Sequence, residues 1–184
     1  MERFARLTSW LFGSLLVALS LFIAVETAIR KLVGVSLQGA DELGGYVLAV
    51  GGALAFTVAL VERAHVRIDF LYVRLPPAAR AALDLLSVLS LAALGLFFAR
   101  YGWLVVRDTL EYGSTAPTAW ATPMIWPQSL WYAALIGFAL ASLWIAARSV
   151  RWLLSGRREA LARALAPRAL EEELEEELAD VTRR

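Results

Sequence analysis

The chain lacks cysteine and contains a single histidine, His65. Without cysteine, the chain can form no disulfide, thiolate metal site, iron–sulfur cluster or covalent haem attachment. With one histidine, it cannot by itself build a bis-histidine haem site or a zinc site based on histidine. These absences exclude most classes of membrane redox enzyme, and we expect no cofactor.

Charge is also scarce. Charged residues make up 19% of the 184 residues, and the formal net charge is only +1. Such a chain has no global field to attract nucleic acid, so we expect no nucleic-acid partner. It also has no carboxylate pair with a histidine, no glycine-rich phosphate loop and no G-x-S-x-G elbow, so the sequence does not predict an enzyme.

Apolar residues are abundant instead. They form 59% of the chain and give a mean hydropathy of +0.60, whereas soluble domains hold roughly 45–50% apolar residues. A membrane-spanning helix needs about 20 mostly apolar residues, and four stretches qualify. We therefore expect an all-α integral membrane fold, in which a domain of residues 1–155 precedes a charged tail of residues 156–184. The approximate spans are residues 8–32, 43–62, 83–106 and 127–148.

The first span is predicted to be a retained helix, because it is longer than the 7–15 or so apolar residues of a signal peptide. Orientation follows from the positive-inside rule. Lysine and arginine are most frequent at the amino end, in the connection between the second and third spans, and at the start of the tail. This bias predicts a multi-pass protein of the bacterial inner membrane with both termini in the cytoplasm. The first and third connections would then face the periplasm.

The middle connection is predicted to lie along the inner membrane interface, because polar and apolar residues alternate through it. Its polar residues are Arg63, His65, Arg67 and Asp69, which suit contact with lipid headgroups. The histidine could also act as a pH switch. Pro76 and Pro77 suit the start of the next helix.

The tail is predicted to form a cytoplasmic amphipathic helix. Leu170, Leu174 and Leu178 recur every four residues among glutamates, a helical period. The glutamates form either a solvated face or a binding surface.

Two acidic positions near span ends are candidate functional residues. Glu26 lies late in the first span, and an acidic group inside a bilayer is a functional candidate. Arg30 follows one turn later, so the two side chains could pair, or Glu26 could contact another subunit or couple protons. Asp41 and Glu42 open the second span, where anions interact favourably with the helix dipole. Asp41 suits an N-cap, and contact with a partner protein is the alternative.

The second span carries two stripes of small residues, which permit close helix packing in lipid. The stripes suggest contacts on two sides, either within the bundle or with a partner. Their members are Gly45, Ala49 and Ala53 on one side and Gly51, Ala55 and Ala59 on the other.

These features together resemble the small permease subunit of tripartite ATP-independent periplasmic (TRAP) transporters, the DctQ-like proteins, over about residues 1–155. The most specific element is the H-V-R-I-D stretch at residues 65–69. The weaker elements are Glu26 with Arg30, Asp41-Glu42 with Tyr46, and a Thr/Pro/Trp-rich segment at residues 115–127.

The resemblance implies three components. A periplasmic receptor captures an organic acid or a similar solute, a large multi-span permease subunit carries it with sodium by an elevator motion, and the small subunit is a scaffold. The partners of this chain would then be the large subunit, the receptor and membrane lipids. The residues expected at partner or lipid interfaces are Glu26, Arg30, Asp41, Glu42, Gly45, Arg63, His65, Arg67 and Asp69.

Two rival interpretations stay open. A self-sufficient proton-coupled exporter of the small multidrug type also has four helices and a glutamate in the first, although such exporters are shorter and lack the charged middle segment. A membrane assembly protein unrelated to transport is the second rival.

Overall fold

The computed structural model describes residues 2–36, 38–61 and 74–157. These residues form four long helices, and each contains a stretch that is long and apolar enough to cross a membrane. The described residues form no strand, so the predicted all-α fold with four spans is confirmed. The expected interfacial segment and the expected tail helix lie outside the described residues. The helices are α1 (Glu2–Val33), α2 (Ala40–Val61), α4 (Pro77–Tyr112) and α5 (Ile125–Leu154).

The helix α4 is longer than the span predicted within it. It begins at Pro77, as expected, because the first turn tolerates a residue without an N–H group. It ends at Gly113, whose positive φ of 60° lets its N–H group bond back to the carbonyl of Thr109. Its 36 residues extend about 54 Å at 1.5 Å per residue. The hydrocarbon core is about 30 Å thick, so the helix continues beyond it.

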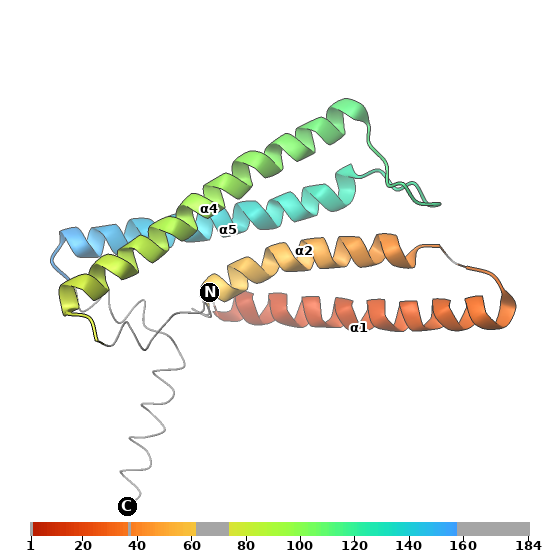
Figure 1. Cartoon of the computed structure of the whole chain (residues 1–184), viewed down its shortest axis with the longest axis horizontal. Coiled ribbons are helices and arrows are strands. Elements are labelled where there is room, and N and C mark those ends of the chain that lie inside the picture. Colours follow the sequence, from red (N-terminus) through yellow and green to blue (C-terminus); the bar gives the residue numbers. More distant parts are fainter. Residues whose placement is uncertain (1, 37, 62–73, 158–184) are drawn as a thin grey trace, which may run out of the picture.

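The four helices form two antiparallel pairs, with α1 beside α2 and α4 beside α5 (Figure 1). Contacts between α2 and α5 join the pairs, which leaves α1 at the edge of the bundle, packed against α2. The α1–α2 and α4–α5 connections lie at the same end of the molecule, which we call the loop end (Figure 1). The start of α1 and the end of α5 lie toward the opposite end.

The closest helix contact is between α4 and α5. A Cβ atom added at Gly95 would lie 2.7 Å from the Ser142 hydroxyl and 2.9 Å from the Ala139 Cα. Only glycine lets the two backbones approach this closely, which is how helices gain packing energy in lipid. Beside this contact, Phe138 is fully buried.

An aromatic cluster joins three helices at mid-height. The ring of Phe56 in α2 lies 5.7 Å from the rings of both Phe98 in α4 and Phe138 in α5, measured between centroids. These separations are typical of favourable aromatic pairs. The cluster lies where the two helix pairs meet, with Phe138 fully buried, Phe98 partly buried and Phe56 still 42% exposed.

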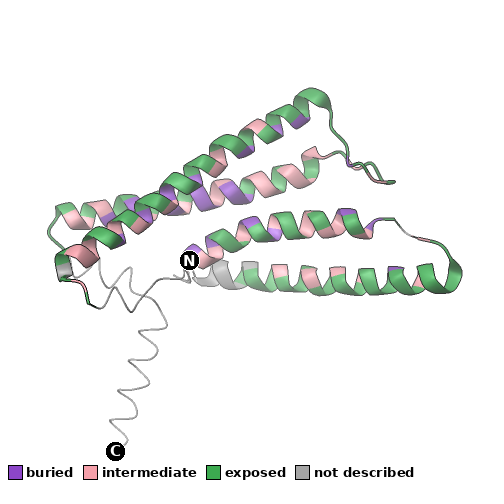
Figure 2. Cartoon of the chain, in the orientation of Figure 1, coloured by how far each residue is buried: buried purple, intermediate pink, exposed green. Residues whose placement is uncertain are grey.

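Much of the helix surface is exposed (Figure 2), and it includes many large apolar side chains. On α1 the exposed residues include Leu15, Leu21 and Val25, and Glu26 is the one buried residue whose side chain is described there. Such exposure would be a liability in water, but it suits a surface covered by lipid or by another membrane protein.

The small residues of α2 serve two internal contacts, one from each predicted stripe. Gly51 is buried under the ring of Phe12 from α1. Ala53 is buried in a cluster with Ala134 and Leu135 of α5. The expectation of contacts on two sides is therefore met inside the chain. Gly45 is exposed, with open space around it.

We predict that Gly95→Ala destabilises the protein by about 1–3 kcal/mol, the usual effect of overpacking a tight contact. The added methyl group would force α4 away from the Ala139 backbone. The measurement is unfolding in detergent, followed by circular dichroism. Gly137→Ala on α5 is the matched control, because a Cβ atom there meets no other group within 4 Å. Equal stability of the two variants would contradict the prediction.

Candidate functional site

The α4–α5 connection folds back on itself as a short hairpin-like loop. The Ala116 N–H donates to the Thr122 carbonyl at 2.9 Å, and the Met124 N–H donates to the Ser114 carbonyl at 3.0 Å. An isolated bridge pairs Thr115 with Pro123. These bonds satisfy much of the loop's backbone internally, which suits a segment lying at a membrane surface.

The tip of this loop packs on the start of α2. The indole of Trp120 lies so close to Gly39 that any side chain at residue 39 would collide with it. Gly39 is buried, and its carbonyl accepts a hydrogen bond from the Leu43 N–H at the first turn of α2. The tryptophan therefore holds the two connections of the loop end against each other.

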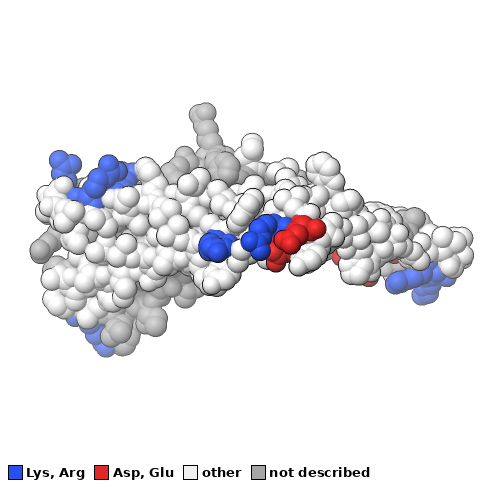
Figure 3. Space-filling model, turned by 90° about the horizontal axis from the view of Figure 1, so that it is seen from above, with Lys and Arg blue, Asp and Glu red and all other residues white. Residues whose placement is uncertain are grey.

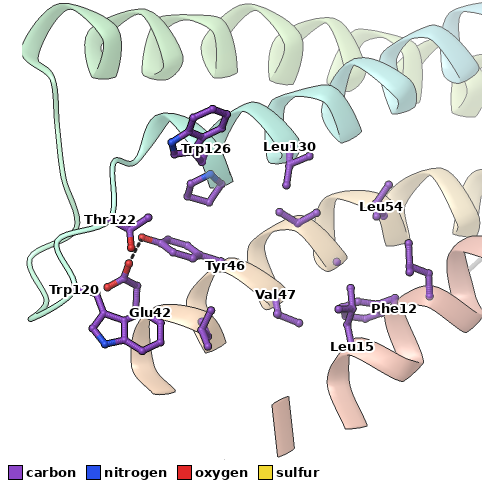
Figure 4. A pocket seen from close by; sticks show the side chains of 15 residues that line it. Phe12, Leu15, Glu42, Tyr46, Val47, Leu54, Trp120, Thr122, Trp126 and Leu130 are labelled. Atoms are coloured by element: carbon purple, nitrogen blue, oxygen red, sulfur yellow. Dashed lines mark hydrogen bonds between the residues drawn. The ribbon is translucent and has the colours of Figure 1, made fainter. Parts of the chain in front are cut away.

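Glu42 also joins the start of α2 to the α4–α5 loop by hydrogen bonds. Its carboxylate is buried, and Oε1 accepts a 2.9 Å bond from the Tyr46 hydroxyl while Oε2 accepts one from the Thr118 hydroxyl. Tyr46 also lies 3.7 Å from the Met124 sulfur, and Thr122 lies beside the pair (Figure 4). Both carboxylate oxygens are thus used within the chain.

Asp41 does not cap α2, so the N-cap prediction is wrong. The helix already begins at Ala40, which places Asp41 inside the first turn, where its side chain is exposed. Trp120 packs on Gly39 directly before the helix start. At this position the aspartate can still interact with the helix dipole.

Glu26 is buried on α1, with a relative exposure of 6%. Its Oε1 accepts a 2.9 Å hydrogen bond from the Ser36 hydroxyl, and its buried Oε2 has no partner among the described residues. The expected pairing with Arg30 is absent from the ion pairs of the described residues, and Arg30 is exposed. The chain reverses at Gly34, with φ of 75°, and this turn brings Ser36 to the carboxylate instead.

A polar cavity of about 390 Å³ adjoins Glu26. It lies between the end of α1, the start of α2 and the tip of the α4–α5 loop. Its polar lining residues are Glu26, Thr27, Arg30, Ser36, Gln38, Asp41 and Thr118.

An apolar cavity of about 360 Å³ lies between α1, α2 and the start of α5 (Figure 4). Phe12 and Leu15 of α1 line one wall, and Trp126 and Leu130 of α5 line another. Glu42 lies at its loop end, where its oxygens are already bonded. The walls therefore offer an apolar surface suited to an acyl chain or an apolar side chain.

Charged side chains gather toward the two ends of the molecule, with a smaller mixed group between them (Figure 3). On α4, Arg107 and Asp108 form an exposed ion pair at 3.4 Å, and Arg100 is exposed. At the far end of α5, Arg148 stacks over Trp152, with its guanidinium carbon 4.3 Å from the ring centroid. The predicted cluster at residues 63–69 lies outside the described residues.

Two contacts of the loop end were missed by sequence reasoning. Ser36 and Thr118 each reach a buried glutamate, but Thr118 lies 76 residues from Glu42 along the chain. No periodicity links residues that far apart. The Tyr46–Glu42 bond has the four-residue spacing of neighbours on a helix, a signal that could have been used.

Among the described residues, no group of three or more histidine, cysteine, aspartate or glutamate side chains is placed to hold a metal ion.

A protein-family model described as Tripartite ATP-independent periplasmic transporters, DctQ component, matches residues 19–155. The chain belongs to this family. No curated protein matches the chain in a comparison of sequences.

Membership identifies the chain as a small permease subunit of a TRAP transporter, and the family is a transporter component rather than an enzyme family. DctQ components function with a large permease and a periplasmic receptor. The four apolar helices agree with a multi-pass protein of the inner membrane. The matched region covers α2, α4 and α5 in full and the second half of α1, from residue 19 onward.

We predict that Thr118→Val lowers the melting temperature of this DctQ component by a few degrees. The change keeps the side-chain shape but leaves Glu42 Oε2 buried without its donor. Thr115→Val is the control, because Thr115 is exposed in the same loop and the bridge it forms is made by its backbone. The measurement is thermal unfolding in detergent. An unchanged melting temperature for Thr118→Val would show that this bond does not hold the loop.

Proposed function

We propose that this subunit is a fixed scaffold for the large permease subunit and carries no solute itself. In this proposal the large subunit moves an organic acid or a similar solute together with sodium. The small subunit anchors it in the bilayer and helps to form the surface on which the periplasmic receptor docks.

The observation that carries the proposal is the set of three phenylalanine rings at mid-height. Phe56, Phe98 and Phe138 pack together where α2, α4 and α5 meet, and the Phe138 ring is fully buried. Solute sites in secondary transporters usually combine broken helices with polar groups near the midplane. Here each span is one continuous helix.

Buried charge supports the same conclusion. Among the described residues the buried charged side chains are Glu26 and Glu42 at the loop end and Asp84 toward the opposite end. An ion pathway would be expected to place charged groups between these levels, whereas the buried polar side chains there, such as Thr57 and Ser142, carry no charge. The placement of the buried carboxylates near the ends instead suits hydrogen bonds that hold the helix connections together, and contacts with partner subunits.

We also propose that the loop end faces the periplasm and that both termini are cytoplasmic. Arg74, Arg80, Arg148 and Arg151 lie toward the opposite end, whereas Arg30 and Lys31 lie at the loop end. The excess of arginine marks the cytoplasmic side. The α4–α5 loop would then be available to the receptor.

The exposed apolar faces of α1 and α4 are the surfaces proposed to meet the large subunit or lipid. Leu86 and Leu96 on α4 are more than half exposed, as are Leu11 and Leu21 on α1. Helices that associate in lipid are held together by close van der Waals packing of their side chains rather than by the hydrophobic effect.

The scaffold proposal predicts that the purified chain alone transports no solute. The measurement is uptake of labelled organic acids into proteoliposomes with an imposed sodium gradient. Uptake should appear when the large subunit and the receptor are reconstituted with the chain. Sodium-driven uptake by the chain alone would contradict the proposal.

A second prediction concerns assembly. When the two permease subunits are produced together, the chain should co-purify with the large subunit in mild detergent at a stable ratio. Size-exclusion chromatography with light scattering measures the composition. Recovery only as a homo-oligomer would instead favour the self-sufficient exporter.

A further inference from the structure

The two buried glutamates of the loop end are bonded differently. Glu42 is 5% exposed and Glu26 is 6% exposed, so their burial is matched. Glu42 has a donor for each oxygen, from Tyr46 and Thr118. Glu26 has one donor, Ser36, and its second oxygen has none among the described residues.

An unpaired buried carboxylate oxygen is costly, because the group has lost water without gaining a donor. The nearest basic residue along the helix, Arg30, is exposed and forms no ion pair with Glu26 among the described residues. A buried acceptor of this kind needs an explanation from outside the described residues. The missing donor is an N–H or O–H group.

The polar cavity beside Glu26 suits a cationic donor. Its lining has two carboxylates, from Glu26 and Asp41, against one guanidinium, from Arg30. Ile23, Ala40 and Pro117 give it an apolar wall. A lysine or arginine side chain matches both parts, because its stem is apolar and its head is charged.

The size of the cavity argues against a bare metal ion. Calcium takes six to eight oxygen ligands at about 2.3–2.6 Å, and a space of about 390 Å³ is far too large to be closed around one ion. Water fits the space, since one molecule needs only about 10–15 Å³. Water would therefore fill the cavity before a partner side chain displaces it.

We propose that this cavity receives a lysine or arginine side chain of the large permease subunit, which pairs with the Glu26 carboxylate. The inference rests on the proposed function, because it assumes that this chain packs against that subunit. Glu26 lies on α1, the edge helix, whose described side chains are otherwise mostly exposed. A partner helix that covers α1 near its loop end could bring such a side chain to the cavity.

The test compares Glu26→Gln with Glu42→Gln. In the isolated chain, Glu26→Gln should leave the melting temperature unchanged or raise it, because it removes an unpaired buried charge. Glu42→Gln should lower the melting temperature, because both of its oxygens are bonded within the chain. A decrease for Glu26→Gln as large as that for Glu42→Gln would overturn the proposal, because Glu26 would then be an internal structural residue.

The same variants are then produced with the large subunit. Glu26→Gln should reduce the complex recovered through a tag on that subunit by at least about tenfold, the scale of losing one partner of a buried charged pair. Glu111→Gln is the control, because it removes an exposed carboxylate from α4 and should leave recovery unchanged. Full recovery of complex with Glu26→Gln would overturn the proposal.

Charge reversal identifies the partner residue. Glu26→Lys should abolish the complex, and one Lys→Glu or Arg→Glu substitution in the large subunit should restore it. Failure of every such substitution to restore assembly would overturn the proposal, and so would an effect of Glu26→Gln that appears only when the receptor is present.

If the wild-type chain does not bind the large subunit at all, the proposed function fails. If the Glu26→Gln variant binds the large subunit as well as the wild-type chain does, only this inference fails.

Discussion

Hydrocarbon offers a peptide backbone no hydrogen bonds, and each unsatisfied backbone group there costs several kcal/mol. Every segment that crosses the bilayer must therefore bond to itself. This protein meets the constraint with continuous helices, from α1 (Glu2–Val33) to α5 (Ile125–Leu154). The same constraint shapes the α4–α5 connection. There the Ala116 N–H donates to the Thr122 carbonyl, so that the loop folds back and bonds to itself.

Once the backbone is satisfied, helix association depends on close packing and on a few polar contacts. Gly95 lets α4 approach the backbone of α5, and Gly51 accepts the ring of Phe12 from α1. At the loop end, Glu42 adds a hydrogen-bonded link between α2 and the α4–α5 loop. The buried carboxylates thus lie toward the ends of the bundle, and the described interior between them holds uncharged side chains such as Phe138 and Ser142. That distribution suits a subunit that holds a position in the membrane better than one that passes an ion through it.

The edge position of α1 has a functional consequence. A helix packed against one neighbour offers most of its surface to lipid or to another subunit, and α1 contacts α2. The one buried residue described on it is Glu26, and among the described residues a donor reaches one of its two carboxylate oxygens. A half-bonded carboxylate on an otherwise apolar edge helix is costly for the isolated subunit, and a partner that supplies a donor would offset that cost.

Much of the fold was predictable from residue patterns. The four spans, the helix start at Pro77 and the family all followed from apolar runs, proline placement and short motifs. The details of the loop end were not predictable. Asp41 suited either an N-cap of α2 or a partner contact, and Glu26 could pair with Arg30, contact another subunit or couple protons. In the structure the helix begins at Ala40 and Glu26 bonds to Ser36.

The sequence by itself determined which segments are helical and which are apolar enough to enter a membrane, because both properties depend on neighbours along one chain. Only the tertiary structure decided the partners of the buried carboxylates. Glu42 meets Thr118 across 76 residues, and the reversal at Gly34 turns the chain so that Ser36 reaches Glu26. Such bonds depend on how two connections pack at the same end of the bundle, and no local pattern encodes that packing.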